Sequence, residues 1–176
     1  MIRTRVGYCG GAKQNPTYHD LGDHTETIEI DFDPQRISYE QLLRVFWTAH
    51  NPCGKAWSRQ YRSAIFYHDD AQRQAIDTTK HLFVLRPDTI NTAIEPYERF
   101  WLAEDYHQKY RLRYEPELAH DLIARCGGER GFVDSTAAAR LNGYLDGHGT
   151  RAQLEREIER LGLSPADQQL VRQHVR

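Results

Sequence analysis

The sequence predicts an α+β fold, a small mixed sheet packed by helices, followed by a C-terminal α-helical extension. Through about residue 102, short runs that alternate apolar and polar residues interleave with segments at helical spacing. From Pro116 onward, helix-like segments follow one another without strands. A chain of 176 residues is long enough for one domain with an appendage and a core of its own. We place an α/β domain at residues 1–130 and the helical extension at 131–176.

The first half of the chain contains most of the predicted strands. Residues 3–8 predict a strand that ends at Cys9-Gly10-Gly11, where glycines permit a tight turn. Residues 25–32 predict a second strand, and the capping box of Ser38 and Gln41 opens a helix that reaches His50. Further along we expect a strand at 61–68, a helix from 70 to 86, an extended stretch at 91–102 and a short helix at 103–113.

The second half contains helix start and stop signals. Pro116 opens a helix that closes at Gly127, and Asp134 or Ser135 opens the next. Thr150 opens a third helix, and Ser164-Pro165 opens the last. These helices either dock on the sheet or form a subunit contact.

Composition argues against several classes of partner. The net charge of −2 and the isoelectric point near 6.5 give no field that would attract nucleic acid or an anionic membrane. No run of about 18 apolar residues is present, and the N-terminus lacks the apolar core of a signal peptide. We therefore expect a cytoplasmic protein with neither nucleic-acid nor membrane partners.

The three cysteines, Cys9, Cys53 and Cys126, lie far apart in the sequence. No CxxC spacing occurs, so neither a disulfide scaffold nor a structural zinc site is indicated, whereas redox-active thiols are possible. Cys9 lies at a strand end beside a tight turn, where backbone N–H groups would favour a thiolate. A small buried hydrophobic residue under the turn is an equally good interpretation of Cys9.

Glu26 has an unusual position in its strand. Alternation places Glu26 with Ile28, Ile30 and Phe32 on one face, which predicts that this carboxyl group points inward. Loss of solvation penalises the charged form of a carboxyl group, and a neutral acid can give a proton to an oxygen atom. Alternatively, Glu26 caps the strand end in contact with water or pairs with His24.

Several ordered blocks resemble one known family. They are Val6-Gly7-Tyr8-x-Gly10-Gly11, Asn15-Pro16-Thr17-Tyr18, His24-x-Glu26, Asp33-Pro34, Ile37-Ser38-Tyr39, Leu42-Leu43, Phe46-Trp47, Gln60-Tyr61-Arg62-Ser63-Ala64-Ile65 and Ala103-Glu104-Asp105-Tyr106-His107-Gln108-x-Tyr110. Over residues 5–110 this pattern is similar to the A-type peptide methionine sulfoxide reductases. The helices after about residue 130 lie outside the resemblance.

The resemblance implies an activity and its residues. In that family a thiolate attacks the sulfur of a methionine (S)-sulfoxide, a Glu supplies a proton to the oxygen, and two Tyr hydroxyls hold that oxygen. The matching positions are Glu26, Tyr18 and Tyr61, and we expect Tyr8 and Trp57 to line the substrate pocket. Methionine sulfoxide, free or in a peptide, would be the substrate, a thioredoxin-like protein the reductant, and no cofactor or metal would be needed.

The sequence also departs from the family pattern. The family nucleophile lies in a Gly-Cys-Phe-Trp segment before the Val-Gly-Tyr block, and this chain begins after that position, so we expect an N-terminally truncated version of the fold. The acidic residue that precedes the Gln-Tyr pair in the family has no counterpart among residues 54–59.

Three hypotheses follow from these departures. In the first, the chain is a reductase in which Cys9 attacks the sulfoxide and Cys53 or Cys126 resolves the sulfenic acid. In the second, it is an inactive binding module whose pocket is walled by Trp57 and Phe66. In the third, it is a changed enzyme in which His24, Glu26, His50 and a cysteine bind a transition metal or activate another sulfur substrate.

Overall fold

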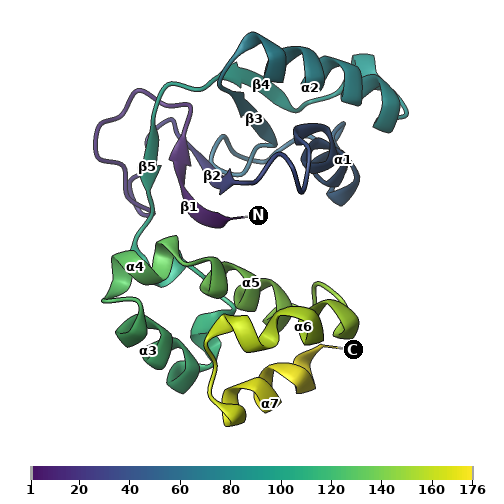
Figure 1. Cartoon of the computed structure of the whole chain (residues 1–176). Coiled ribbons are helices and arrows are strands. Elements are labelled where there is room, and N and C mark those ends of the chain that lie inside the picture. Colours follow the sequence, from purple (N-terminus) through teal and green to yellow (C-terminus); the bar gives the residue numbers. More distant parts are fainter. Residues whose placement is uncertain (1, 176) are drawn as a thin grey trace. The chain divides into compact units, whose positions relative to one another are not determined.

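The computed structural model describes residues 2–175, and its contacts divide the chain into two units (Figure 1). We call Val6–Ala103 the sheet unit, and Met1–Arg5 together with Glu104–Arg176 the helical unit. The domain boundary that we predicted at residue 130 marks the end of the region that resembles the family, and it stays a prediction. Among residues 2–175, no helix combines the length and apolar character needed to cross a membrane.

The sheet unit contains two small sheets. Strands β1 (Arg3–Cys9), β2 (Thr25–Asp31) and β5 (Phe100–Leu102) form one sheet in the order β2-β1-β5, with β1 and β5 antiparallel. Strands β3 (Ala64–Tyr67) and β4 (Ala93–Pro96) form a parallel pair. The predicted α+β class is confirmed. The antiparallel pair of β1 and β5 belongs to one sheet, and the parallel pair of β3 and β4 forms the other.

Two helices pack against each other in the sheet unit (Figure 1). Helix α1 (Tyr39–Ala49) begins at the predicted capping box, in which Ser38 and Gln41 bond reciprocally, and α2 (Asp70–Phe83) begins at Asp69. Their apolar faces meet in a core of four buried residues, Leu43, Trp47, Ile76 and Val84. The buried indole N–H of Trp47 donates to Thr79 Oγ1 at 3.0 Å, so that its polar atom is satisfied.

The helical unit contains α3 (Pro116–Arg125), α4 (Glu129–Asp134), α5 (Thr136–Leu145), α6 (Arg151–Glu157) and α7 (Pro165–His174). The predicted starts at Ser135, Thr150 and Ser164 are confirmed, since each side chain accepts a bond from the first turn. The core of the unit includes Phe132, Leu141, Leu154, Ile158 and Val171.

The helix predicted at 103–113 is wrong. The structure has only two 3-10 turns in this region, at Asp105–His107 and Leu112–Tyr114. Between them Lys109 adopts a φ of 54°, a left-handed conformation that ends a helix. Its buried ammonium group donates to the carbonyl oxygens of Thr4 at 2.5 Å and Val133 at 2.7 Å, and burial lowers the pKa of Lys109 to about 8.

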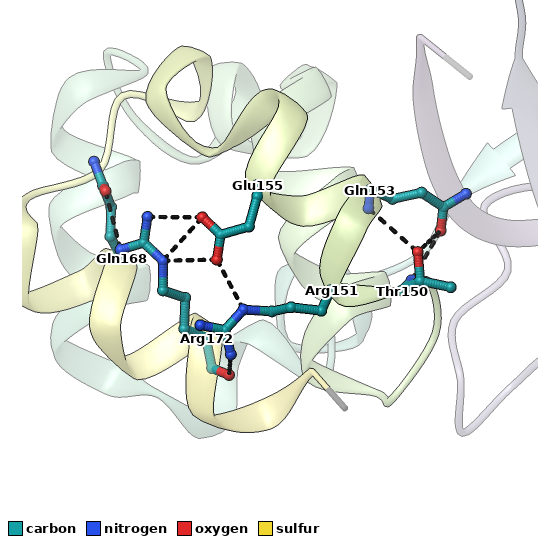
Figure 2. A network of polar contacts seen from close by, with 6 residues as sticks. All are labelled: Thr150, Arg151, Gln153, Glu155, Gln168 and Arg172. Atoms are coloured by element: carbon teal, nitrogen blue, oxygen red, sulfur yellow. Dashed lines mark hydrogen bonds and ion pairs between the residues drawn. The ribbon is translucent and has the colours of Figure 1, made fainter.

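A polar network joins α6 to α7 (Figure 2). The Glu155 carboxylate accepts bonds from Arg172 Nε at 3.0 Å and Arg151 Nε at 2.8 Å. These bonds from Arg172 and Arg151 lower the pKa of Glu155 to about 2. At the start of α6, Thr150 and Gln153 form a second capping box.

Candidate active site

Two phenols, one amide and one carboxylate lie together in the sheet unit. The hydroxyl oxygens of Tyr18 and Tyr61 are 3.4 Å apart. Gln60 Nε2 donates to Glu26 Oε1 at 2.7 Å and to the hydroxyl of Tyr61 at 3.1 Å. Three of these residues are those the resemblance implied, and the structure links them through a fourth, Gln60.

Backbone contacts fix this cluster from two sides. The N–H of Glu26 donates to the carbonyl of Gln60 at 2.9 Å, and the hydroxyl of Thr25 donates to the carbonyl of Arg59 at 3.2 Å. Arg62 Nε donates to Thr25 Oγ1 at 2.8 Å. Residues 59–62 are therefore bonded to the first two residues of β2, although 34 positions separate Glu26 from Gln60 in the sequence.

The loop that carries Tyr18 is organised by its own polar groups. The carboxylate of Asp23 accepts from the backbone N–H groups of Ala12 and Lys13, and these bonds lower the pKa of Asp23. The buried ring of His24 accepts from the Gly11 N–H at Nδ1, which leaves Nε2 to donate to the carbonyl of Lys13 at 2.8 Å. His24 therefore holds the loop together.

The expectation that Glu26 points into the core is wrong. Glu26 is exposed, and Ile28 on the same face of β2 has 54% of its surface exposed. Strand β2 is an edge strand of its sheet, and Glu26 and Ile28 line an open groove instead of a packed core. The carboxylate is placed by the Gln60 hydrogen bond rather than by burial.

Tyr61 keeps its proton at neutral pH. Hydrogen bonding to Tyr18 is the main reason that the pKa of Tyr61 rises to about 12. The ring of Trp57, 83% exposed, lies 4.8 Å from the ring of Tyr61 at an angle of 32°. The site thus presents two hydroxyl donors and an indole face at the surface of the sheet unit.

A groove of about 420 Å³ borders the carboxylate. Its lining includes Cys9, Glu26, Ile28, Phe46 and Phe66. The carboxylates of Glu29 and Asp31 also line it, so the groove combines apolar walls with charged groups and has the size to hold the side chain of a small organic substrate.

Cys9 borders this groove but is not an exposed thiolate. It has 1% of its surface exposed, and burial raises its pKa to about 11. The Gly10 backbone N–H lowers that pKa as expected for a turn, but the effect of burial is larger. The predicted amide-stabilised thiolate is therefore wrong, and the alternative interpretation of a buried small residue describes Cys9 in this structure.

The other two cysteines lie in different units. Cys53 Sγ is 3.4 Å from Thr89 Oγ1 in the sheet unit, and Cys126 follows α3 in the helical unit. No disulfide is formed among the described residues. Their assignment as resolving cysteines stays a prediction.

Two other assignments made from the sequence disagree with the structure. Tyr8 is 2% exposed in a small core with Leu21 and Ala103, so that it offers no surface to a substrate. The metal hypothesis fails at His24, because both ring nitrogens are engaged with the backbone. Within residues 2–175 no group of three metal-ligating side chains is assembled. Trp57 lies beside Tyr61 but is not among the residues that line the groove, so its place in a substrate pocket stays a prediction.

Sequence reasoning missed Gln60. The only signal was its place beside Tyr61 in a block matched to the family, because helical or strand periodicity does not reveal which polar residue bonds to which.

The structure brings a carboxyl group and two phenols, three groups that can hydrogen-bond to an oxygen atom, to one surface point of an α+β fold. Comparison with known proteins assigns the lineage: a sequence model of the family "Peptide methionine sulfoxide reductase" matches residues 1–136, and the chain belongs to this family.

Several known proteins are similar to this chain in sequence or structure over most of its length. A peptide methionine sulfoxide reductase of Drosophila melanogaster is 42% identical over 178 residues, covering 99% of this chain and 71% of that protein. A peptide methionine sulfoxide reductase A5 of Oryza sativa subsp. japonica is 40% identical and covers 82% of this chain, which spans 59% of the rice protein. Reduced Mxr1 from Saccharomyces cerevisiae superposes with a TM-score of 0.57 at 28% identity, over 65% of this chain and 71% of the yeast chain.

Proposed function

We propose that this chain acts on methionine sulfoxide, free or in a peptide, as a thiol-dependent reductase. The observation that carries the proposal is the hydrogen-bonded cluster of Glu26, Gln60, Tyr61 and Tyr18 beside an open groove. Family membership and the names of the relatives support the same substrate class.

The chemistry consumes two thiols. A thiolate attacks the sulfoxide sulfur and forms a sulfur–sulfur bond while the oxygen takes up a proton. The oxygen then moves to the cysteine sulfur as its bond to the substrate and the sulfur–sulfur bond break, so that the cysteine is oxidised to a sulfenic acid and the sulfoxide is reduced to a thioether. A second thiol attacks the sulfenic acid, which forms a disulfide and releases the oxygen as water. A dithiol such as dithiothreitol or a thioredoxin-like protein then returns the disulfide to two thiols.

Glu26 and the two phenols would handle the oxygen. The hydroxyls of Tyr18 and Tyr61 donate to the sulfoxide oxygen as negative charge builds on it, which stabilises the transition state. The carboxyl group of Glu26 delivers a proton to the same oxygen, since a protonated oxygen leaves sulfur more easily than an oxyanion.

Cys9 is the thiol we assign to the attack, because it borders the same groove as Glu26. A thiol of pKa about 11 is ionised to only about one part in 10⁴ at pH 7. Attack by Cys9 therefore requires the turn at Gly10 to open, and we expect slow turnover. Cys53 or Cys126 would resolve the sulfenic acid. A cytoplasmic location and the lack of nucleic-acid and membrane partners stay predictions from composition.

The test is a steady-state assay of methionine (S)-sulfoxide reduction with dithiothreitol. We expect Glu26→Gln to reduce kcat/KM at least about 10²-fold, in the usual range for loss of a proton donor. Glu98→Gln makes the same chemical change at an exposed position of the sheet unit and should leave the rate unchanged. Cys9→Ser should abolish turnover, whereas full activity in Cys9→Ser would eliminate Cys9 as the nucleophile.

A second candidate function is sulfoxide binding without turnover. The buried, weakly acidic Cys9 favours it, and the exposed Trp57 beside Tyr61 offers contact area to a peptide. Measurable affinity for a sulfoxide peptide without product formation, lost in Glu26→Gln, would support this function over catalysis.

A further inference from the structure

Gln60 occupies a central place in the cluster that neither the resemblance nor the comparisons assign. Its backbone carbonyl accepts the N–H of Glu26, and its side chain returns to the carboxylate of the same residue. The side chain is half-buried. Gln60 is therefore attached to Glu26 by two hydrogen bonds, one from the backbone and one from the side chain.

The direction of the side-chain bonds follows from their chemistry. An amide nitrogen carries two hydrogens and does not accept, so Nε2 is the donor in both contacts, to Glu26 Oε1 at 2.7 Å and to the Tyr61 hydroxyl at 3.1 Å. Rotating the amide would place its carbonyl oxygen against the Glu26 carboxyl oxygen, so that two acceptors would face each other. Both hydrogens of the amide are thus committed, one to the acid and one to the phenol.

This arrangement determines where the Tyr61 proton points. Because the Tyr61 oxygen accepts from Gln60, its own hydrogen is directed elsewhere. The Tyr18 hydroxyl, 3.4 Å away, can accept it, at a distance near the long limit of an O–H···O bond. An incoming S=O oxygen is a stronger acceptor than a phenol and would take this proton instead.

We propose that Gln60 is a positioning residue that makes the site selective for a sulfoxide over a thioether. Its amide holds the Glu26 carboxylate and turns the Tyr61 hydroxyl proton toward the ligand oxygen. A thioether has no oxygen to receive that proton and gains nothing from the arrangement. The inference rests on the proposed function, because it concerns the ligand of the same site.

The experiment compares two peptides that differ by one oxygen atom. Isothermal titration measures the affinity of the intact chain for a peptide with one methionine (S)-sulfoxide and for the same peptide with methionine. Gln60→Met retains the length of the side chain without its donors, and it should reduce the preference for the sulfoxide about tenfold, typical of losing a hydrogen bond to a charged or strongly polar partner. The affinity for the thioether peptide should not change.

The Gln60→Glu variant adds a measurement, the pH dependence of sulfoxide affinity, that would not change if Gln60 had only a structural role. At pH 7.5 this variant places a second carboxylate beside Glu26, and it should lose more sulfoxide affinity than Gln60→Met. Two adjacent carboxyl groups share a proton at acid pH, and a protonated Glu at this position donates as the amide does. The loss of sulfoxide affinity in Gln60→Glu should therefore be smaller at pH 5.5 than at pH 7.5, whereas the loss in Gln60→Met should be the same at both. This comparison also serves if Gln60→Met fails to fold.

The matched control is Gln74→Met, an exposed position on α2. If the wild type prefers the sulfoxide and Gln60→Met behaves like Gln74→Met, the positioning role is overturned and the proposed function stands. Equal weakening of both peptides in a folded Gln60→Met also overturns it. If the wild type shows neither preference nor turnover, the proposed function fails and this inference fails with it.

Discussion

Arg62 connects β2, β4 and the segment that carries the candidate site, so its removal should cost stability. Its guanidinium donates to both carboxylate oxygens of Glu95, at 2.6 and 2.7 Å, and its Nε donates to Thr25 Oγ1 at 2.8 Å. The Arg62 side chain is 16% exposed and that of Glu95 is 33% exposed. We consider Arg62→Met, which keeps most of the aliphatic stem but removes the charge and all three donors.

The magnitude follows from partial burial. Breaking a fully buried pair costs about 3–5 kcal/mol, and an exposed pair contributes at most about 1 kcal/mol. A bidentate, partly screened pair lies between these limits, so we expect Arg62→Met to lower the free energy of unfolding by about 2 kcal/mol at pH 7.

The effect should depend on pH with a definite sign. Arg62 lowers the pKa of Glu95 in the folded state. A carboxyl group whose folded pKa is depressed contributes stability that is present above its unfolded pKa and is lost as the pH falls through the folded value. The difference between wild type and Arg62→Met should therefore be largest near neutral pH and shrink below the ordinary Glu pKa of 4.5.

Tryptophan fluorescence provides the assay. The three tryptophans, Trp47, Trp57 and Trp101, all lie in the sheet unit, so urea unfolding followed by fluorescence reports on that unit. A double-mutant cycle with Glu95→Gln isolates the pair. A coupling energy below about 0.5 kcal/mol, or a cost independent of pH, would refute the reasoning, because either result is typical of a solvated surface pair.

Three further predictions concern other parts of the molecule. Gly10→Ala should destabilise the sheet unit by about 2 kcal/mol or more by urea unfolding, because Gly10 has a φ of 77° and a Cβ there would lie 2.5 Å from the Phe66 ring. The stability of the helical unit, followed by far-ultraviolet circular dichroism, should rise between pH 8 and 10. The reason is that the pKa of Lys109 is about 8 in the folded protein and 10.5 in the unfolded chain. In Lys109→Met this rise should vanish. Iodoacetamide should label Cys53 well before Cys9 in the native protein, whereas equal rates by mass spectrometry would mean that Cys9 is exposed in solution.

Local signals in the sequence predicted the helix starts well. Ser38, Ser135, Thr150 and Ser164 are short polar residues whose oxygens accept from the first turn, and this interaction needs no distant partner. The helix predicted at 103–113 is absent because the structure of this segment depends on partners that local signals do not reveal. Its helical composition is overridden by the buried contacts of Lys109 with Val133 and Thr4, which are distant in the sequence.

The resemblance brought Tyr18, Tyr61 and Glu26 to one site, whereas physical reasoning from the residues placed Glu26 in the wrong environment. Alternation identifies which residues share a face of a strand, but burial depends on what covers that face. Strand β2 lies at a sheet edge, and the face that carries Glu26 and Ile28 opens on the groove.

The exposure of Glu26 bears on how this residue would deliver a proton. In the free site the Glu26 carboxyl group accepts a hydrogen bond from Gln60 Nε2 at 2.7 Å, which holds it at the border of the groove. Substrate that fills the groove would remove water from the Glu26 carboxyl group, at the place where the proposed function needs its proton. Glu26→Asp should separate these requirements. The charge remains but is withdrawn by one methylene from Gln60, so catalysis should fall while the fold remains. An Asp variant with full kcat would show that the Gln60 contact is dispensable for proton delivery.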